Sequence, residues 1–463
     1  MSTATKPLSS PTLLEAEPLA ARMARATAAV SLDALPAEVV AKAKLCLMDI
    51  VGCAFESRDL PWSVQARTLA APAPAGGGAT IIGSPHPSSH ADAAFANAVM
   101  GHGLVREDMH SGSISHLGIV VLPALLALAQ LKRVHGRDFI AATVAGYEVG
   151  GQVGRAAMDA EIARIHRPTG VTGPVAAAAA GARLLGLDAE QTTSAIALGT
   201  NTTLGFNQWA HTGGSEMFFH AGFAARNAVT AARLAQAGAF ASPSALDGEA
   251  GLFAALRKRS AAARVELFRA APEILSVYHK PVPACNFAQT PCQAALRLAK
   301  EHRFEPARIA SIRIRVPRAG AMYPGCDYTG PFAHVLQAKM SIQYNVAAAL
   351  LLGGVSERNF TLLSDAKLHR LIGLMRLEID DEMTRAYPGL QGGEVEVTDA
   401  SGGAQRIRLD NVVNATADDV RSRFRAAVAE GLGAGRAAEV EAFIEALDRQ
   451  PDAGALGALL RPE

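Results

Sequence analysis

The sequence lacks several features that mark common protein classes. Its few cysteines, Cys46, Cys53, Cys285, Cys292 and Cys326, form no Cys-x-x-Cys pair, so we predict neither a disulfide framework nor a structural zinc site, and a reducing cytoplasm fits best. Lys and Arg (44) nearly balance Asp and Glu (43), which gives no support for nucleic-acid binding. A secretory signal and an apolar run of about 18 residues are also missing, so no export and no membrane span are predicted.

Phosphate-binding and hydrolase motifs are missing too. The chain has no GxxxxGK[ST], no GxGxxG after a strand and no GxSxG. Nucleotide, nicotinamide and α/β-hydrolase functions are therefore not favoured.

Alanine and helical periodicity dominate what is present. Residues 1–20 are predicted to be a loose leader, a helix is expected from about Pro36, and residues 79–83 (ATIIG) suggest a short β segment. From about 92 to 256 the chain is Ala-rich and helical. After about residue 270 the pattern changes. Residues 308–317 predict a half-exposed strand, 340–354 a buried helix and 393–410 a β-hairpin, before helices return from 417 onwards.

The first two of four polar clusters lie beside Gly or Pro breaks, where functional side chains often sit. Residues 101–118 combine three histidines with charged side chains, namely His102, Arg106, Glu107, Asp108, His110 and His116. Imidazoles beside carboxylates suit acid–base chemistry, although a polar capping loop or a metal site has the same composition. His166 and Arg167 precede Pro168 at a helix start, which suits a carboxylate but is also an ordinary helix cap.

The other two clusters are at residues 207–227 and 276–295. The first contains His220, which we interpret as a structural helix-end residue. The second contains Lys280, which could bind a carboxylate, and Cys285, which we interpret as a core or pocket-wall residue.

Five segments in one order resemble the MmgE/PrpD family. They are VVAKAKLCLMDIVGCAFES from residue 39, ANAVMGHGLVREDMHSGSISHLGIVVLPALLALAQ from 96, IHRPTGVTGPVAAAAAGARLLGLD from 165, KPVPACNFAQTPCQAAL from 280 and AKMSIQYNVAAALL from 338. No single motif is specific, but the order holds from about residue 30 to 450. The resemblance implies a mainly α fold, with a large helical domain built from both chain ends (1–268 and 413–463) and an inserted α+β lid (269–412).

The family resemblance also implies an activity. Its members include dehydratases, decarboxylases and epimerases that need no cofactor in most cases and act as homodimers, with the active site between the helical domain and the lid. We therefore predict a lyase or isomerase that removes a proton from the carbon next to a carboxylate of a small di- or tricarboxylate. No metal is predicted.

Site residues carry over from the family one at a time. His116 and His166 match its active-site histidines and are predicted as the acid–base pair, Asp108 is predicted to orient a histidine, and Lys280 matches a substrate-binding lysine. The remaining predicted substrate-binding residues are His102, Arg106, Arg167, Met217, Gln289 and Tyr323.

The sequence departs from the family at several of these positions. Val105–Met109 stand where many members have Asp-Phe-Asp-Asp-Thr, so Glu107 replaces the middle Asp and Asp108 alone is unchanged. Met217 replaces a lysine and Gln289 a histidine. Losing a charge-assisted contact typically costs about 1.5–3 kcal/mol, so poor activity on 2-methylcitrate and cis-aconitate is predicted. Arg106 is the candidate to replace the lost charge.

Two other functions stay open at this point. Val105 and Met217 favour a catalytically silent member that only binds a carboxylate. The histidines 102, 110 and 116 would instead suit metal-assisted hydrolysis.

Overall fold

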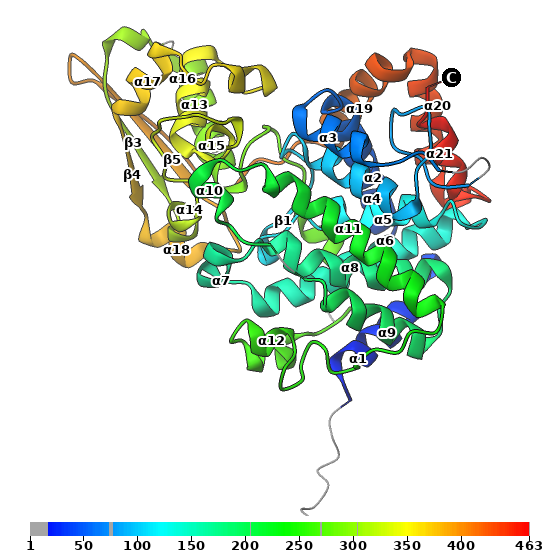
Figure 1. The fold of residues 1–463 in the computed structure, drawn as a ribbon. Coiled ribbons are helices and arrows are strands. Elements are labelled where there is room, and N and C mark those ends of the chain that lie inside the picture. The colour runs from blue at the N-terminus through cyan, green and yellow to red at the C-terminus, as the bar shows by residue number, and fades with distance from the viewer. Residues whose placement is uncertain (1–16, 74–76, 204, 269–270, 303, 463) are drawn as a thin grey trace, which may run out of the picture.

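The structure, a computed structural model, describes residues 17–73, 77–203, 205–268, 271–302 and 304–462. Figure 1 shows a large helical body with a smaller unit, the lid, to one side. The helices of the body before the lid are α1 (Leu19–Ala29), α2 (Ala37–Glu56), α3 (Pro61–Leu69), α4 (His90–His102), α5 (Gly118–Leu128), α6 (Gly136–Ala157), α7 (Ala160–Ile165), α8 (Pro168–Leu185), α9 (Ala189–Thr200), α10 (Trp209–Thr212), α11 (Glu216–Gln236) and α12 (Leu252–Ala255).

Helix α8 lies at the centre of the body and packs against α5, α6, α9 and α11. Its Ala-rich sequence allows this, because small side chains let helix backbones approach closely. A Cβ added at Gly146 of α6 would lie 2.9 Å from the Cβ of Ala180, and one added at Gly150 would lie 2.7 Å from that of Ala176. Glycine in α6 and alanine in α8 are therefore required together by the packing.

The C-terminal helices belong to the body. They are α19 (Ala417–Leu432), α20 (Ala434–Glu445) and α21 (Leu456–Leu459). Helix α19 packs against α2 and α20, so the end of the chain returns to its beginning, as the red and blue helices in Figure 1 show.

The lid combines a sheet with six helices among the described residues. Its strands are β3 (Ile309–Val316), β4 (Met375–Ile379), β5 (Gly393–Asp399) and β6 (Ala404–Leu409), in the order β4-β3-β5-β6 with only the β3–β4 pair parallel. Its helices are α13 (Gln289–His302), α14 (Arg318–Met322), α15 (Val335–Met340), α16 (Ile342–Leu352), α17 (Ala366–Gly373) and α18 (Asp381–Ala386). Helix α13 covers one face of the sheet and also contacts α16.

A two-stranded sheet joins the body to the segment that enters the lid. Strand β1 (Met109–His110) pairs antiparallel with β2 (Val277–Tyr278), so Met109 lies opposite Tyr278. This pairing brings the 102–116 loop of the body beside Lys280, although the two segments are far apart in the sequence.

Most of the predicted elements are present. The mainly α fold is confirmed, as are the strand at 309–316, the helix before Gly353 and the hairpin at 393–409. The predicted β segment at 79–83 is wrong: Ala79 forms only an isolated bridge to Ser88. Strand β4 was not predicted.

Other expectations concern the ends of segments. The predicted leader lies mostly outside the described residues, and Leu19 already belongs to α1. The domain boundary at 269 is also outside them, so the division at 268 and 412 stays a prediction. No described helix is both long and apolar enough to cross a bilayer.

Candidate active site

A small cavity lies between the body and the lid. Its body side is formed by Val105, Met109, Ile114, His116, Arg167, Trp209 and Met217, and its lid side by Cys285, Asn286, Phe287, Tyr323 and Met340. The volume is about 20 Å³, enough for about one water molecule. The space between the body and the lid is therefore nearly filled by side chains.

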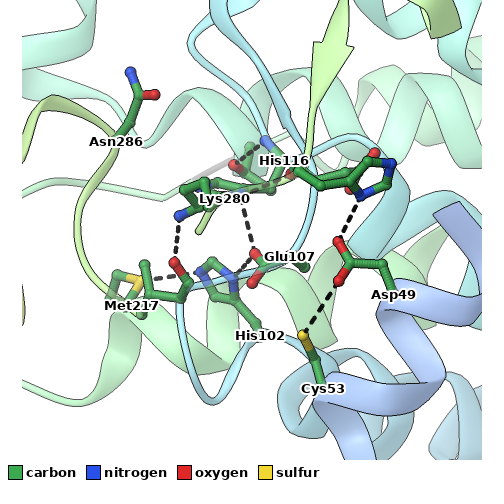
Figure 2. A network of polar contacts seen from close by, with 12 residues as sticks. Asp49, Cys53, His102, Glu107, His116, Met217, Lys280 and Asn286 are labelled. Carbon is green, nitrogen blue, oxygen red and sulfur yellow. Dashed lines mark hydrogen bonds and ion pairs between the residues drawn. The ribbon is translucent and has the colours of Figure 1, made fainter. Parts of the chain in front are cut away.

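The carboxylate of Glu107 lies beneath this cavity, fully buried between two imidazoles. Oε1 of Glu107 is 2.9 Å from Nδ1 of His116 and also contacts Nδ1 of His102. Figure 2 shows the three side chains together with Lys280 and Met217. A single buried carboxylate thus positions two histidines, whose rings lie edge to face 5.1 Å apart.

Hydrogen bonding defines the proton positions on His116. Its Nδ1 faces two acceptors, Oε1 of Glu107 and, at 3.2 Å, the carbonyl oxygen of Asp108. Nδ1 must therefore carry the proton, which leaves the lone pair on Nε2. His116 lines the cavity, and its backbone N–H donates to Thr169 Oγ1 (3.1 Å) in the first turn of α8, which fixes its position.

Arg167 fixes the same tautomer in His102, with the proton on Nδ1. Nη2 of Arg167 lies 3.0 Å from Nε2 of His102. A guanidinium can only donate, so Nε2 accepts and Nδ1–H points to Glu107. Sδ of Met217 lies 3.0 Å from the same Nε2, and the hydroxyl of Tyr323 on the lid accepts from Nη1 of Arg167 at 3.3 Å.

Lys280 lies behind the cavity wall rather than on its surface. Its Nζ donates to the carbonyl oxygens of Val105 and, at 3.3 Å, Ala284. Two contacts fix the backbone around it: Nη1 of Arg423 in α19 donates to the Lys280 carbonyl (2.9 Å), and Nδ1 of the neighbouring His279 lies 2.8 Å from Oδ2 of Asp49 in α2. The first and last parts of the body therefore hold the lysine in place.

Burial and neighbouring charges shift the pKa values of these groups. Burial lowers the pKa of His116 to about 3, and the charge of Lys280 adds to this, while Glu107 opposes it. Burial also lowers the pKa of Lys280 to about 8, against the opposing effect of Glu107. For Glu107, burial raises the pKa, but the contacts with His102 and His116 outweigh it and hold the pKa well below its ordinary range. At neutral pH the site thus contains an ionised Glu107 and a neutral His116.

Two β-branched residues of the cavity wall have strained backbones. Val105 has φ of 57° and Ile114 has φ of 54°, in the left-handed region that such residues rarely occupy. They lie on either side of the Glu107 segment. Strain of this kind persists where the surrounding structure imposes it, often at functional sites.

The structure does not bring the predicted pair His116 and His166 together. His166 does not line the cavity; its ring lies 5.8 Å from that of Phe206, to which its backbone also forms a bridge. His166 and Arg167 both have extended backbones, so their side chains point to opposite sides and Arg167 alone reaches the cavity.

Three other predicted residues have different neighbours from those expected. Oδ2 of Asp108 accepts from the hydroxyl of Tyr147 at 2.6 Å rather than orienting a histidine. Arg106 pairs with Glu56 (Nη1–Oε1 3.0 Å) away from the cavity, so it does not replace the missing charge.

Gln289 is also structural. Its amide bonds to the backbone of Val282, Ala284 and Cys285 and shapes the loop that follows Lys280. The predicted residues His102, Arg167, Met217 and Tyr323 do lie at the site, and Cys285 forms part of its wall.

The three histidines of the metal hypothesis are not assembled. Nε2 of His110 lies 2.6 Å from Oε2 of Glu273, in a separate contact. His102, Glu107 and His116 do have ligand-type atoms within 4.8 Å of one another. However, both Nδ1 atoms carry protons, that of His102 directed at Glu107 and that of His116 facing Glu107 and the Asp108 carbonyl oxygen. The cationic Arg167 and Lys280 are adjacent, so the arrangement suits proton sharing better than cation binding.

Sequence reasoning missed the central position of Glu107. The sequence does point to Glu107, because this residue replaces the family's middle Asp and lies five positions after His102. The contact between Asp49 and His279, which holds the Lys280 segment, could not be predicted from the sequence, because the two residues are 230 positions apart.

The fold and the site define a class of protein: a helical body that includes the C-terminal helices, with a smaller α+β unit beside it and a buried carboxylate–imidazole group next to the cavity between them. The MmgE/PrpD N-terminal domain model matches residues 21–264, and the MmgE/PrpD C-terminal domain model matches residues 282–449. The chain belongs to the MmgE/PrpD family.

The chain is similar to cis-aconitate decarboxylases and to a cis-aconitate decarboxylase-like protein. The chain is 34% identical over 212 residues to the cis-aconitate decarboxylase-like protein oryM of Aspergillus oryzae, and 30% identical over 215 residues to cis-aconitate decarboxylase of Aspergillus terreus. These matches cover 44% of this chain and 44% and 43% of the two fungal proteins, less than half of their length. The human cis-aconitate decarboxylase is 26% identical over 392 residues, which cover 80% of this chain and 79% of that protein.

Proposed function

We propose that this protein is an enzyme that transfers a proton at the carbon next to the carboxylate of a small organic acid. The observation that supports this most strongly is the unprotonated Nε2 of His116, which lines the cavity while Glu107 holds the opposite side of the ring. A base positioned in this way, with a carboxylate behind it, is the usual arrangement for general base catalysis by histidine.

In this mechanism Arg167 binds the substrate carboxylate and His116 accepts the proton from carbon. Negative charge then develops on the carboxylate as the carbanion delocalises. Arg167 and the buried charge of Lys280 stabilise that charge, and Glu107 stabilises the imidazolium that forms on His116. The proposed acid is Tyr323 on the lid. Burial raises the pKa of its hydroxyl, although Arg167 opposes this, so the hydroxyl is protonated at neutral pH.

The proton transfer is common to dehydration, decarboxylation and epimerisation. The names of the relatives favour decarboxylation, whereas Met217 beside Arg167 supports a substrate other than cis-aconitate or 2-methylcitrate. A homodimer, expected from the family resemblance, belongs to the same proposal and is tested by light scattering. A reducing cytoplasm is supported by the five buried, unpaired cysteines.

Solvent exchange tests the proposed function without knowledge of the complete reaction. The protein is incubated in deuterated buffer with a panel of small mono-, di- and tricarboxylates, and each is followed by proton NMR. We expect loss of a proton signal next to a carboxylate in at least one acid, or its conversion to a product. A protein that binds acids from the panel without exchanging or converting any of them is a silent carboxylate binder, which contradicts the proposal.

A further inference from the structure

Arg167 is a buried cation without a counter-ion. It is 5% exposed and forms no ion pair among the described residues. Its partners are all uncharged: the hydroxyl of Tyr323, the ring of His102, the sulfur of Met217 at 3.4 Å, and the Trp209 ring, whose centroid lies 5.8 Å from Cζ. Its buried Nε–H has no hydrogen-bond partner in the described chain. Buried charges are costly unless they are paired, so this guanidinium is suited to an anionic ligand that completes its hydrogen bonds.

Arg167 is also the only cationic side chain among the residues that line the cavity. Lys280 is close, but its ammonium group already donates to the carbonyl oxygens of Val105 and Ala284. The cavity surface therefore offers one position where a carboxylate can be paired directly.

Most of the other wall residues are apolar, and the polar ones, His116, Trp209, Asn286 and Tyr323, carry no positive charge at neutral pH. Val105, Met109, Ile114, Met217 and Met340 contribute apolar side chains, and their exposed fractions are at most 6%. Methionine side chains are flexible and adapt to the shape of an apolar ligand. A second carboxylate in this space would lose its hydration without gaining a charged partner.

We propose that the substrate of this site carries a single carboxylate, bound by Arg167, and an apolar remainder that lies against the methionine-rich wall. This inference rests on the proposed function for the identity of the site. It narrows the substrate from small carboxylates in general to short monocarboxylates with an alkyl or alkenyl chain, and it assigns Met217 as a specificity-determining residue. Such an acid has no hydroxyl to eliminate and no second carboxylate to lose, so the inference selects epimerisation among the three reactions.

Binding of a matched pair of saturated acids tests the inference. Pentanoate and glutarate differ only in that a terminal methyl group is replaced by a second carboxylate. Calorimetry or NMR titration at pH 7 should show pentanoate binding at least about tenfold more tightly, which corresponds to about 1.4 kcal/mol. Tricarballylate, with three carboxylates, should bind more weakly still.

Variants of the two wall residues sharpen the test. Met217→Lys places a cation beside Arg167 and should reverse the preference, so that glutarate binds more tightly than pentanoate. The control Met322→Lys adds the same charge at a methionine that is 45% exposed outside this cavity and should leave the preference unchanged. Arg167→Gln should weaken both acids.

The outcome is separable from that of the proposed function, because neither probe has to react. His116→Gln, which should abolish exchange at carbon, should keep the preference for pentanoate. Tighter binding of glutarate or tricarballylate by the parent protein, or no measurable binding of pentanoate, would overturn the inference even if exchange is observed with another acid.

Discussion

Nδ1 of His116 and Oε1 of Glu107 lie 2.9 Å apart beneath the cavity between the body and the lid. Nδ1 of His116 faces this carboxylate oxygen and the carbonyl oxygen of Asp108, so Nδ1 carries the proton and Nε2 keeps its lone pair. The contact with Glu107 joins two residues of the 102–116 segment, which also contains the strained residues Val105 and Ile114 of the cavity wall.

Glu107→Gln should lower turnover on the order of 10²–10⁴-fold. Glutamine removes the buried negative charge that stabilises the imidazolium formed on His116, while the carbonyl oxygen of Asp108 still faces Nδ1. Steady-state rates measure the effect, with Asp108→Asn as the matched control, because the Asp108 carboxylate contacts Tyr147 and no imidazole. Equal losses in the two variants would show that Glu107 has no special role.

His166→Ala should leave turnover within about threefold of the parent rate, far below the 10²–10⁴-fold that a general acid or base typically contributes. The reason is that its ring packs beside Phe206 and does not line the cavity. Rates are compared at saturating substrate, together with a thermal melt that monitors folding. A loss of 100-fold in a folded variant would restore His166 as a catalytic residue.

The rate should fall above about pH 8, where Lys280 loses its proton. Below that pKa the ammonium charge is present and stabilises the developing negative charge; above it the charge is lost. We expect a decrease on the order of tenfold, equivalent to about 1.4 kcal/mol in the barrier. Lys280→Met should have a low rate at all pH values and no decrease near pH 8. If the rate of Lys280→Met still decreases near pH 8, the decrease belongs to another titrating group.

The Asp108 carboxyl should make folding pH-dependent. Burial raises its pKa from 3.8 to about 7. Between these values the folded state binds more protons than the unfolded state, so the free energy of unfolding falls as the pH rises from about 4 to 7. The contribution of Asp108 is at most roughly 4 kcal/mol.

Urea unfolding of the parent and Asp108→Asn at pH 4.5 and 7.5 checks this. The asparagine can still accept from Tyr147 and does not ionise, so its stability relative to the parent should be greater at pH 7.5 than at pH 4.5. If the free energies of unfolding of the variant and the parent differ by the same amount at both pH values, the pKa of Asp108 is not raised.

Much of the fold could be predicted from the sequence because periodicity is a local property. The alternation at 309–316 and the hairpin at 393–409 predict strands directly, whereas the five-residue β4 is too short to stand out. The prediction of a β segment at 79–83 is wrong because the pairing stops at one isolated bridge, between Ala79 and Ser88, and does not continue into a strand.

The site was harder to predict because it depends on which way neighbouring side chains point. His166 and Arg167 are adjacent in sequence, but only Arg167 faces the cavity. The same applies to Arg106, Glu107 and Asp108, whose side chains contact Glu56, the two histidines and Tyr147, respectively. Sequence identifies such a cluster but not its orientation.

The central claim is that Nε2 of His116 removes or delivers the proton at carbon. The most direct test is the rate of deuterium incorporation next to the carboxylate of the true substrate, followed by NMR for the parent and for His116→Gln. The account predicts incorporation by the parent at a rate no slower than turnover, and a loss on the order of 10²–10⁴-fold in the variant with ligand binding retained. Near-parental incorporation by folded His116→Gln would contradict it.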